Sequence, residues 1–294
     1  MNNLSKFFPV VDPELVMSCS DDHTKILFDY FADQVDNNIQ TTLVSELMIR
    51  YADVSRQLEE KNQTLKKYNE HLEELVQDKV KEISALQIAT IHALVKSAEA
   101  RDDDTGAHIE RTASFCRLLA EKLQEKGIYQ DIVDAAYSEN ISKASPLHDI
   151  GKIGIRDAIL LKPARLSIDE FEIMKTHVNI GYETLASVEK LYPGNVFLKF
   201  GMEISKYHHE KWDGSGYISG LAGDEIPLSA RIMALSDVYD ALRSKRVYKE
   251  AYSHERASEI ISKGCGSHFD PILTGVFSEH NLLFRDIFDR LSGE

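Results

Sequence analysis

The amino-acid sequence predicts an all-α protein, and three observations support this. Apolar residues recur three and four positions apart over long segments, as on one face of an α-helix. Few stretches alternate polar and apolar residues with the period of two that is typical of strands. The predicted helices of the C-terminal part are separated by loops that contain glycine. We therefore expect a helical bundle, preceded by an N-terminal helical region and a long coiled-coil-like helix.

Composition narrows the class of protein. With 294 residues, 43% of them hydrophobic, the chain can form one good-sized core. No run approaches about 18 apolar residues, so we expect no membrane span. The N-terminus lacks the basic and apolar segments of a secretory signal. Cys19, Cys116 and Cys265 are widely spaced and form neither a disulfide framework nor a metal knuckle, so we expect reduced thiols in a cytoplasmic protein.

The net charge of -14 argues against broad electrostatic binding to DNA, RNA or an anionic membrane. It does not exclude a small phosphorylated ligand, because such a ligand needs only a local positive site. Metals or a few lysine and arginine side chains would supply one.

We divide the chain into three parts. Residues 1–48 contain predicted helices but no motif, so their role is unknown. Residues 49–87 carry an apolar repeat of seven, with Tyr51, Leu58, Leu65, Leu72 and Leu86 at one heptad position. Lys79 interrupts this position, and from Val76 the apolar residues continue four positions out of phase. We expect a helix that forms a homodimer, while a single surface helix packed on its own domain is the alternative.

The third part, residues 88–294, carries most of the recognisable chemistry. Ser167 and Glu170 form a capping box at the start of a predicted helix. Asp270 and Pro271 are typical of an N-cap and a first helical residue, so they predict the start of a C-terminal helix.

Histidine and aspartate residues in this part suggest a metal site. Imidazole and carboxylate together suit Mn, Fe, Zn, Co or Ni, whereas Mg and Ca sites are mostly oxygen. Seven side chains are too many for one metal and about right for two: His108, His148, Asp149, His177, His208, His209 and Asp237. A carboxylate can bridge two metals and leave them sharing a hydroxide that attacks phosphorus.

The order of these motifs resembles the HD-GYP branch of the HD phosphohydrolase superfamily. The resemblance covers the whole third part, through the segments DDDTGAHIER, HDIGKIGI, HHEKWDGSGY and DVYDAL. An isolated His-Asp pair is weak, but HHEKWDGSGY followed by DVYDAL is close to diagnostic. The resemblance implies an all-α HD-type domain.

The resemblance also implies roles for individual residues. His108, His148, Asp149 and Asp237 match the four ligands of the superfamily, with Asp149 as the bridging carboxylate. The extra histidines that give this branch its second metal correspond to His177, His208 and His209. Lys152 matches a lysine that contacts the scissile phosphate.

A third metal would depend on Asp104, four residues before His108 and on the same helix face. Some members have glutamate here and bind a third ion with it. Alternatively, residues 102–104 are a solvated acidic cluster at a helix start. We expect two or three divalent ions, iron or manganese by the resemblance.

We expect the substrate to bind around the loop that follows His209. Four glycines let this loop approach a ligand closely, and Tyr217, whose ring could stack on a guanine, occupies the tyrosine position of the family motif. Ile218 departs from the pattern, since the family has proline there, which leaves substrate selection open. Arg246 and Lys249 match residues that contact the substrate phosphates.

The resemblance implies a phosphodiesterase that opens cyclic di-GMP to linear pGpG, with GMP as a further product. The alternatives are another cyclic dinucleotide, such as 3′,3′-cyclic GMP-AMP, or a catalytically silent receptor that signals through the helix of residues 49–87. A nucleotide triphosphohydrolase of the wider superfamily lacks support from the HHE and GSGY segments.

Overall fold

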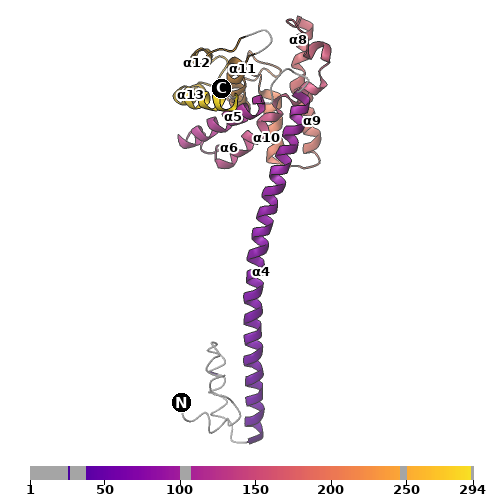
Figure 1. Cartoon of the computed structure of the whole chain (residues 1–294), viewed down its shortest axis with the longest axis vertical. Coiled ribbons are helices and arrows are strands. Elements are labelled where there is room, and N and C mark those ends of the chain that lie inside the picture. The colour runs from indigo at the N-terminus through magenta and orange to yellow at the C-terminus, as the bar shows by residue number, and fades with distance from the viewer. Residues whose placement is uncertain (1–25, 27–37, 100–106, 246–249, 293–294) are drawn as a thin grey trace. The chain divides into compact units, whose positions relative to one another are not determined.

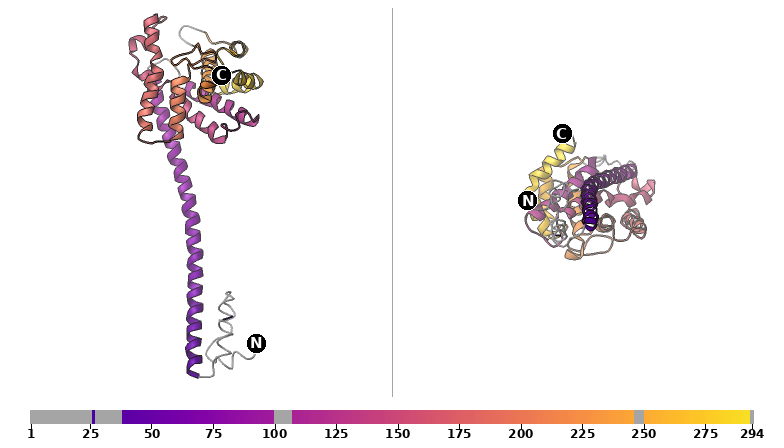
Figure 2. Two further views of the ribbon diagram at one scale, coloured as in Figure 1. Left: turned by 180° about the vertical axis from the view of Figure 1, so that it is seen from behind. Right: turned by 90° about the horizontal axis from the view of Figure 1, so that it is seen from below.

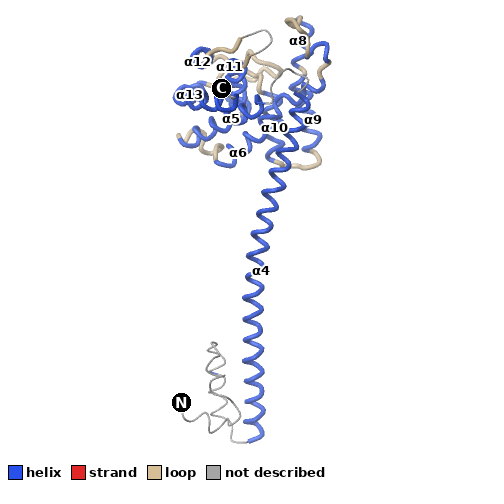
Figure 3. The backbone as a smooth tube through the Cα atoms, viewed as in Figure 1, coloured by secondary structure: helices blue, strands red, loops and turns tan. Residues whose placement is uncertain are grey.

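The computed structural model describes residue 26 and residues 38–99, 107–245 and 250–292. Figure 1 shows the chain as a ribbon and Figure 3 shows the same trace coloured by secondary structure. The described residues form helices and loops, with one isolated bridge between Cys265 and Phe269 and no strand. The predicted all-α fold class is confirmed.

The chain divides into two compact units, Met1–Ser84 and Ala85–Glu294. Helix α4 (Asn38–Glu99) runs through the predicted boundaries at 48–49 and 87–88 without a break. Its heptad side chains are exposed, from 46% for Tyr51 to 68% for Leu86. The three-part division and the coiled coil stay predictions. Among the described helices, none is long and apolar enough to cross a membrane.

The second unit is built from α-helices and two 3-10 helices, seen from two further sides in Figure 2. They are α5 (Ala107–Glu125), α6 (Ala135–Ala144), η1 (Ser145–Gly154), α7 (Asp157–Leu160), α8 (Ile168–Lys175), α9 (His177–Glu189), α10 (Val196–Tyr207), η2 (Gly223–Glu225), α11 (Leu228–Arg243), α12 (His254–Lys263) and α13 (Pro271–Ser292).

Local signals set several helix starts. The capping box is present at α8, where the Ser167 side chain accepts from the Glu170 backbone and the Glu170 side chain accepts in return. Pro271 opens α13, and Asp270 Oδ1 accepts from the Ile272 backbone N–H at 2.7 Å. Both predicted helix starts are confirmed.

The main core lies where α5, α11 and α13 pack together. Its centre is aromatic: Phe115 stacks on Phe284 with 5.2 Å between ring centres and meets Tyr239 edge to face at the same separation. A second apolar cluster joins Val95 of α4 to Ile109, Leu147, Leu185 and Leu198. Ile109 and Leu147 directly adjoin His108 and His148, so this cluster fixes the backbone that carries both histidines.

Helices η1 and α9 approach so closely that only glycine fits between them. A Cβ on Gly151 would lie 1.9 Å from the His177 carbonyl oxygen and 2.5 Å from the Gly181 backbone nitrogen. Both atoms belong to the backbone, so they cannot relieve the clash by a change of rotamer as a flexible side chain could. This contact places the residues of η1 beside His177.

We predict that Gly151→Ala lowers the free energy of unfolding by about 1–3 kcal/mol or more, because the two helices must separate. The matched control is Gly275→Ala in α13, where an added Cβ meets nothing within 4 Å. It should be neutral or stabilise by about 0.4–1 kcal/mol. Chemical denaturation measures both, and equal effects of the two changes would contradict this packing.

Candidate metal centre

The structure brings together all seven of the histidine and aspartate residues predicted as ligands. They form two groups, within each of which the potential ligand atoms lie within 4.8 Å of one another. One group contains Asp149, His177, His208 and His209, and the other contains His108, His148 and Asp237. These are the groups found among the residues that the structure describes.

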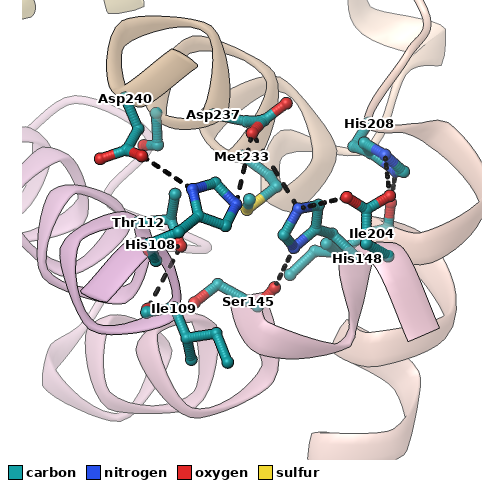
Figure 4. Close-up of polar contacts among 12 residues, drawn as sticks. His108, Ile109, Thr112, Ser145, His148, Ile204, His208, Met233, Asp237 and Asp240 are labelled. Atoms are coloured by element: carbon teal, nitrogen blue, oxygen red, sulfur yellow. Dashed lines mark hydrogen bonds and ion pairs between the residues drawn. The ribbon is translucent and has the colours of Figure 1, made fainter. Parts of the chain in front are cut away.

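Each group draws on helices that are distant in sequence. In the second group, α5 supplies His108 at its first turn, η1 supplies His148, and α11 supplies Asp237. Figure 4 shows these side chains pointing toward one another from the three elements. In the first group, His177 begins α9 and His208 follows the last residue of α10.

Asp149 lies between the two groups and turns one oxygen toward each. Its Oδ2 is 3.1 Å from His148 Nε2, whereas its Oδ1 is 3.3 Å from His177 Nε2 and 3.8 Å from His208 Nε2. A carboxylate in this position can share two metal ions, which in such centres lie about 3.5–4 Å apart. The geometry therefore fits the bridging role implied by the sequence.

Three imidazole rings are oriented by backbone carbonyls. His148 Nδ1 bonds to the Ser145 oxygen at 2.9 Å, His177 Nδ1 to Met174 at 2.8 Å and His208 Nδ1 to Ile204 at 2.9 Å. A carbonyl oxygen only accepts, so each Nδ1 carries the proton and each Nε2 presents its lone pair to the site. This is the second hydrogen bond that metal-binding histidines commonly make.

His108 is held by a carboxylate instead. Its Nδ1 lies 2.8 Å from Asp240 Oδ2, and Arg111 binds Asp240 in a two-point contact of 2.5 and 2.8 Å. Burial by itself would lower the pKa of His108 and raise that of Asp240. The contact with Asp240 outweighs burial and raises the pKa of His108, whereas Arg111 first and His108 second lower the pKa of Asp240.

Sequence reasoning missed Asp240 and Arg111. The available signal was helical spacing, since each lies three residues after a predicted ligand, Asp237 and His108 respectively. That spacing puts each pair on one helix face but does not show that the two faces meet.

The protonation states of three members of the Asp149 group suit cation binding. Burial lowers the pKa of His209 to about 4 and that of His208 well below its usual range, so both rings are neutral near pH 7. Burial would raise the pKa of Asp149, but Lys152 and His148 outweigh it and hold that pKa well below its ordinary value. Neutral imidazole and ionised carboxylate are the forms that bind metal.

Buried polar atoms also fit a cation here. Among the described residues, His177 Nε2, His208 Nε2 and Asp149 Oδ1 are buried and make no hydrogen bond. A buried acceptor left unsatisfied costs about 1–3 kcal/mol, and groups of them call for an explanation such as an ion. All three belong to one group whose potential ligand atoms lie within 4.8 Å of one another, so a divalent metal ion fits this donor set.

Lys152 lies at the edge of the centre. Its ammonium is 3.0 Å from Asp149 Oδ2, one helical turn along η1. A positive charge beside Asp149 would attract an anionic group that approaches the cluster.

The Glu210 side chain holds the loop after His209 in place through hydrogen bonds to its backbone. This role was not predicted from the sequence. The buried Glu210 Oε1 accepts from the Ser219 and Gly220 backbones at 2.6 and 3.2 Å. A Cβ on Gly216 would lie 2.4–2.6 Å from backbone atoms of residues 210 and 211, so glycine is required there. This folding brings Tyr217 onto His209, with 4.7 Å between ring centres.

The sequence singles out four further residues: three expected in the site, and Ile218, which departs from the family motif. Asp104, Arg246 and Lys249 lie outside the described residues. Ile218 follows Tyr217 through a cis peptide bond and its side chain is 40% exposed.

Comparison with known proteins agrees with this arrangement. Residues 54–273 match the family described as HD domain. The chain belongs to the HD domain family. The His148-Asp149 pair at the centre of the site is the pair for which such domains are named, and members are metal-dependent phosphohydrolases.

Several of the relatives come from Vibrio cholerae. A "Probable cyclic di-GMP phosphodiesterase" is 46% identical over 227 residues, covering 77% of this chain and 52% of the relative. A "Cyclic di-GMP phosphodiesterase" is 48% identical over 204 residues, 69% of this chain and 41% of the relative. A "3′3′-cGAMP-specific phosphodiesterase 2" is 41% identical over 190 residues, 65% of this chain and 34% of the relative. The HD-GYP resemblance is thereby confirmed, although the chain spans only about half or less of these relatives.

We predict that Asp240→Asn lowers the free energy of unfolding by about 3–5 kcal/mol, because Arg111 and His108 then lose a buried charged partner. It should also weaken metal binding about 10–100-fold, as loss of a partner behind a ligand does. Thermal unfolding and metal titration measure the two effects.

The matched control is Asp289→Asn, which removes a carboxylate that binds Arg243 at 2.9 Å but is 39% exposed. Its effect on stability should stay below about 1 kcal/mol, with metal binding unchanged. Similar results for the two variants would show that the Asp240 carboxylate contributes no more than an exposed ion pair does.

Proposed function

We propose that this chain is a metal-dependent phosphodiesterase that hydrolyses cyclic di-GMP to linear pGpG, with GMP as a further product. The observation that carries the proposal is Asp149, whose two oxygens face two imidazole groups while Lys152 stands 3.0 Å away. Two relatives are named for cyclic di-GMP hydrolysis, which supports the choice of substrate.

We propose that the seven clustered side chains hold two divalent ions, iron or manganese. When bound, such ions would produce a nucleophile from water at neutral pH and offset charge on the phosphoryl oxygens. Lys152 would bind the scissile phosphate, adding a fixed positive charge where negative charge develops. Arg246 and Lys249 would bind the substrate phosphates, and Tyr217 would shape the site beside His209.

A third ion would involve Asp104, which precedes His108 by four residues. Metal analysis after anaerobic purification tests this, because Asp104→Ala should then contain one ion fewer per chain than the unmodified protein. Unchanged stoichiometry would restrict the centre to two ions.

The second candidate substrate is 3′,3′-cyclic GMP-AMP, favoured by Ile218 in the place of the family's proline and by a relative named for that nucleotide. Comparison of kcat/KM for the two compounds on the same preparation separates the candidates. Equal or faster turnover of the mixed nucleotide would replace cyclic di-GMP as the substrate.

We predict that Asp149→Asn lowers kcat/KM for cyclic di-GMP by more than about a hundredfold and reduces bound metal, since even partners behind a ligand contribute 10–100-fold. The control is His71→Gln, which changes a histidine that is 74% exposed on α4. Less than one ion per chain in the unmodified protein, without turnover after anaerobic Fe(II) or Mn(II) loading, would instead favour a silent receptor.

We also propose that α4 forms a homodimer. Leu58 and Leu65 are each 58% exposed and Leu72 is 54% exposed, one heptad apart. Three such residues in register would find apolar partners on a second copy of the helix.

We predict that Leu58→Ala combined with Leu65→Ala shifts the protein from dimer to monomer at micromolar concentration in sedimentation velocity. The control Lys66→Ala lies on the same stretch of helix outside the stripe and should stay dimeric. A monomeric unmodified protein would refute dimerisation through α4.

A further inference from the structure

Helix α8 carries an aromatic ring and an ammonium group that contact Tyr217, in the loop that follows His209. Phe171 and Lys175 lie four residues apart and therefore share one face of α8. The Phe171 ring meets the Tyr217 ring edge to face, with 6.0 Å between centres. Lys175 Nζ lies 5.0 Å from the centre of the Phe171 ring and 5.6 Å from that of Tyr217.

Two ring contacts link α8 to the candidate metal centre: Phe171 with Tyr217, and Tyr217 with His209. Tyr217 stacks on His209, a member of the Asp149 group, with 27° between the ring planes. Tyr217 is thus already engaged by His209, Phe171 and Lys175. Phe171 is the outer ring of this row and is 43% exposed.

The surroundings favour a nucleotide base as the occupant of the exposed Phe171 surface. A purine has a flat π-face, and base stacking on aromatic side chains is common in nucleic-acid-binding proteins. Lys175 holds its ammonium over the same ring and pairs with the Glu172 carboxylate at 2.6 Å. A purely apolar partner on this ring would have to bury part of that ion pair, which costs free energy, whereas a nucleotide base brings polar edges of its own.

We propose that Phe171 is a base-stacking residue of the substrate site, with Tyr217 positioning its ring relative to His209. The inference rests on the proposed function, because the base belongs to the cyclic dinucleotide whose phosphate lies at the metals. Stacking tolerates any base. Phe171 therefore contributes equally to cyclic di-GMP and to 3′,3′-cyclic GMP-AMP.

The test compares Phe171→Ala with Ile173→Ala in the full chain loaded with Mn(II). Ile173 is the matched control, since it lies on the same helix and is 44% exposed. For Phe171→Ala we expect KM for either dinucleotide to rise roughly five- to a hundredfold, with kcat and metal content nearly unchanged. Phe171→Trp should restore KM, and Ile173→Ala should leave it unaltered.

Calorimetric binding of GMP and of inorganic phosphate provides a second readout. Phe171→Ala should weaken GMP binding by a similar factor and leave phosphate binding as it is. Equal weakening of GMP and phosphate, equal effects of the two alanine variants, or no effect of Phe171→Ala would each overturn the proposal. If the unmodified protein turns over neither dinucleotide, the proposed function fails, while the GMP and phosphate titrations still decide the role of Phe171.

Discussion

The Asp149 carboxylate, kept ionised by Lys152 and His148, is the group around which the candidate metal centre is arranged. Its side chain is 11% exposed, Lys152 and His148 depress its pKa, and each oxygen faces a different set of imidazole nitrogens. The rings of His208 and His209 are neutral, so they offer lone pairs, and not positive charge, to the same site. Metal ions bound among these groups would accept the imidazole lone pairs and balance the carboxylate charge, and the other features of the site hold these side chains in place.

The fold supplies that support through backbone contacts more than through long side chains. Gly151 lets η1 lie against the start of α9, and the carbonyls of Ser145, Met174 and Ile204 turn the imidazole rings inward. His108 is held by a side-chain partner instead, Asp240, which Arg111 binds in turn. Substitutions at these supporting positions would therefore change metal affinity without removing a ligand.

The sequence predicted the helical fold, the ligand types and their order, because periodicity and donor chemistry are local properties. All seven predicted ligands gather in the structure in two groups. Asp240, Glu210 and Phe171 were missed for a physical reason: each acts through a contact with a segment whose position depends on packing. The Asp240 contact with His108 joins residues 132 positions apart, and no local pattern encodes that meeting. The expectations for Asp104, Arg246 and Lys249 remain predictions.

Anomalous scattering from crystals of the Mn(II)-loaded protein tests most directly whether Asp149 bridges two ions. Data collected at the manganese edge should show two peaks about 3.5–4 Å apart, one on each side of the Asp149 carboxylate. One peak should lie among His177, His208 and His209, and the other among His108, His148 and Asp237. A single peak, or a pair of peaks that Asp149 does not contact, would contradict the account.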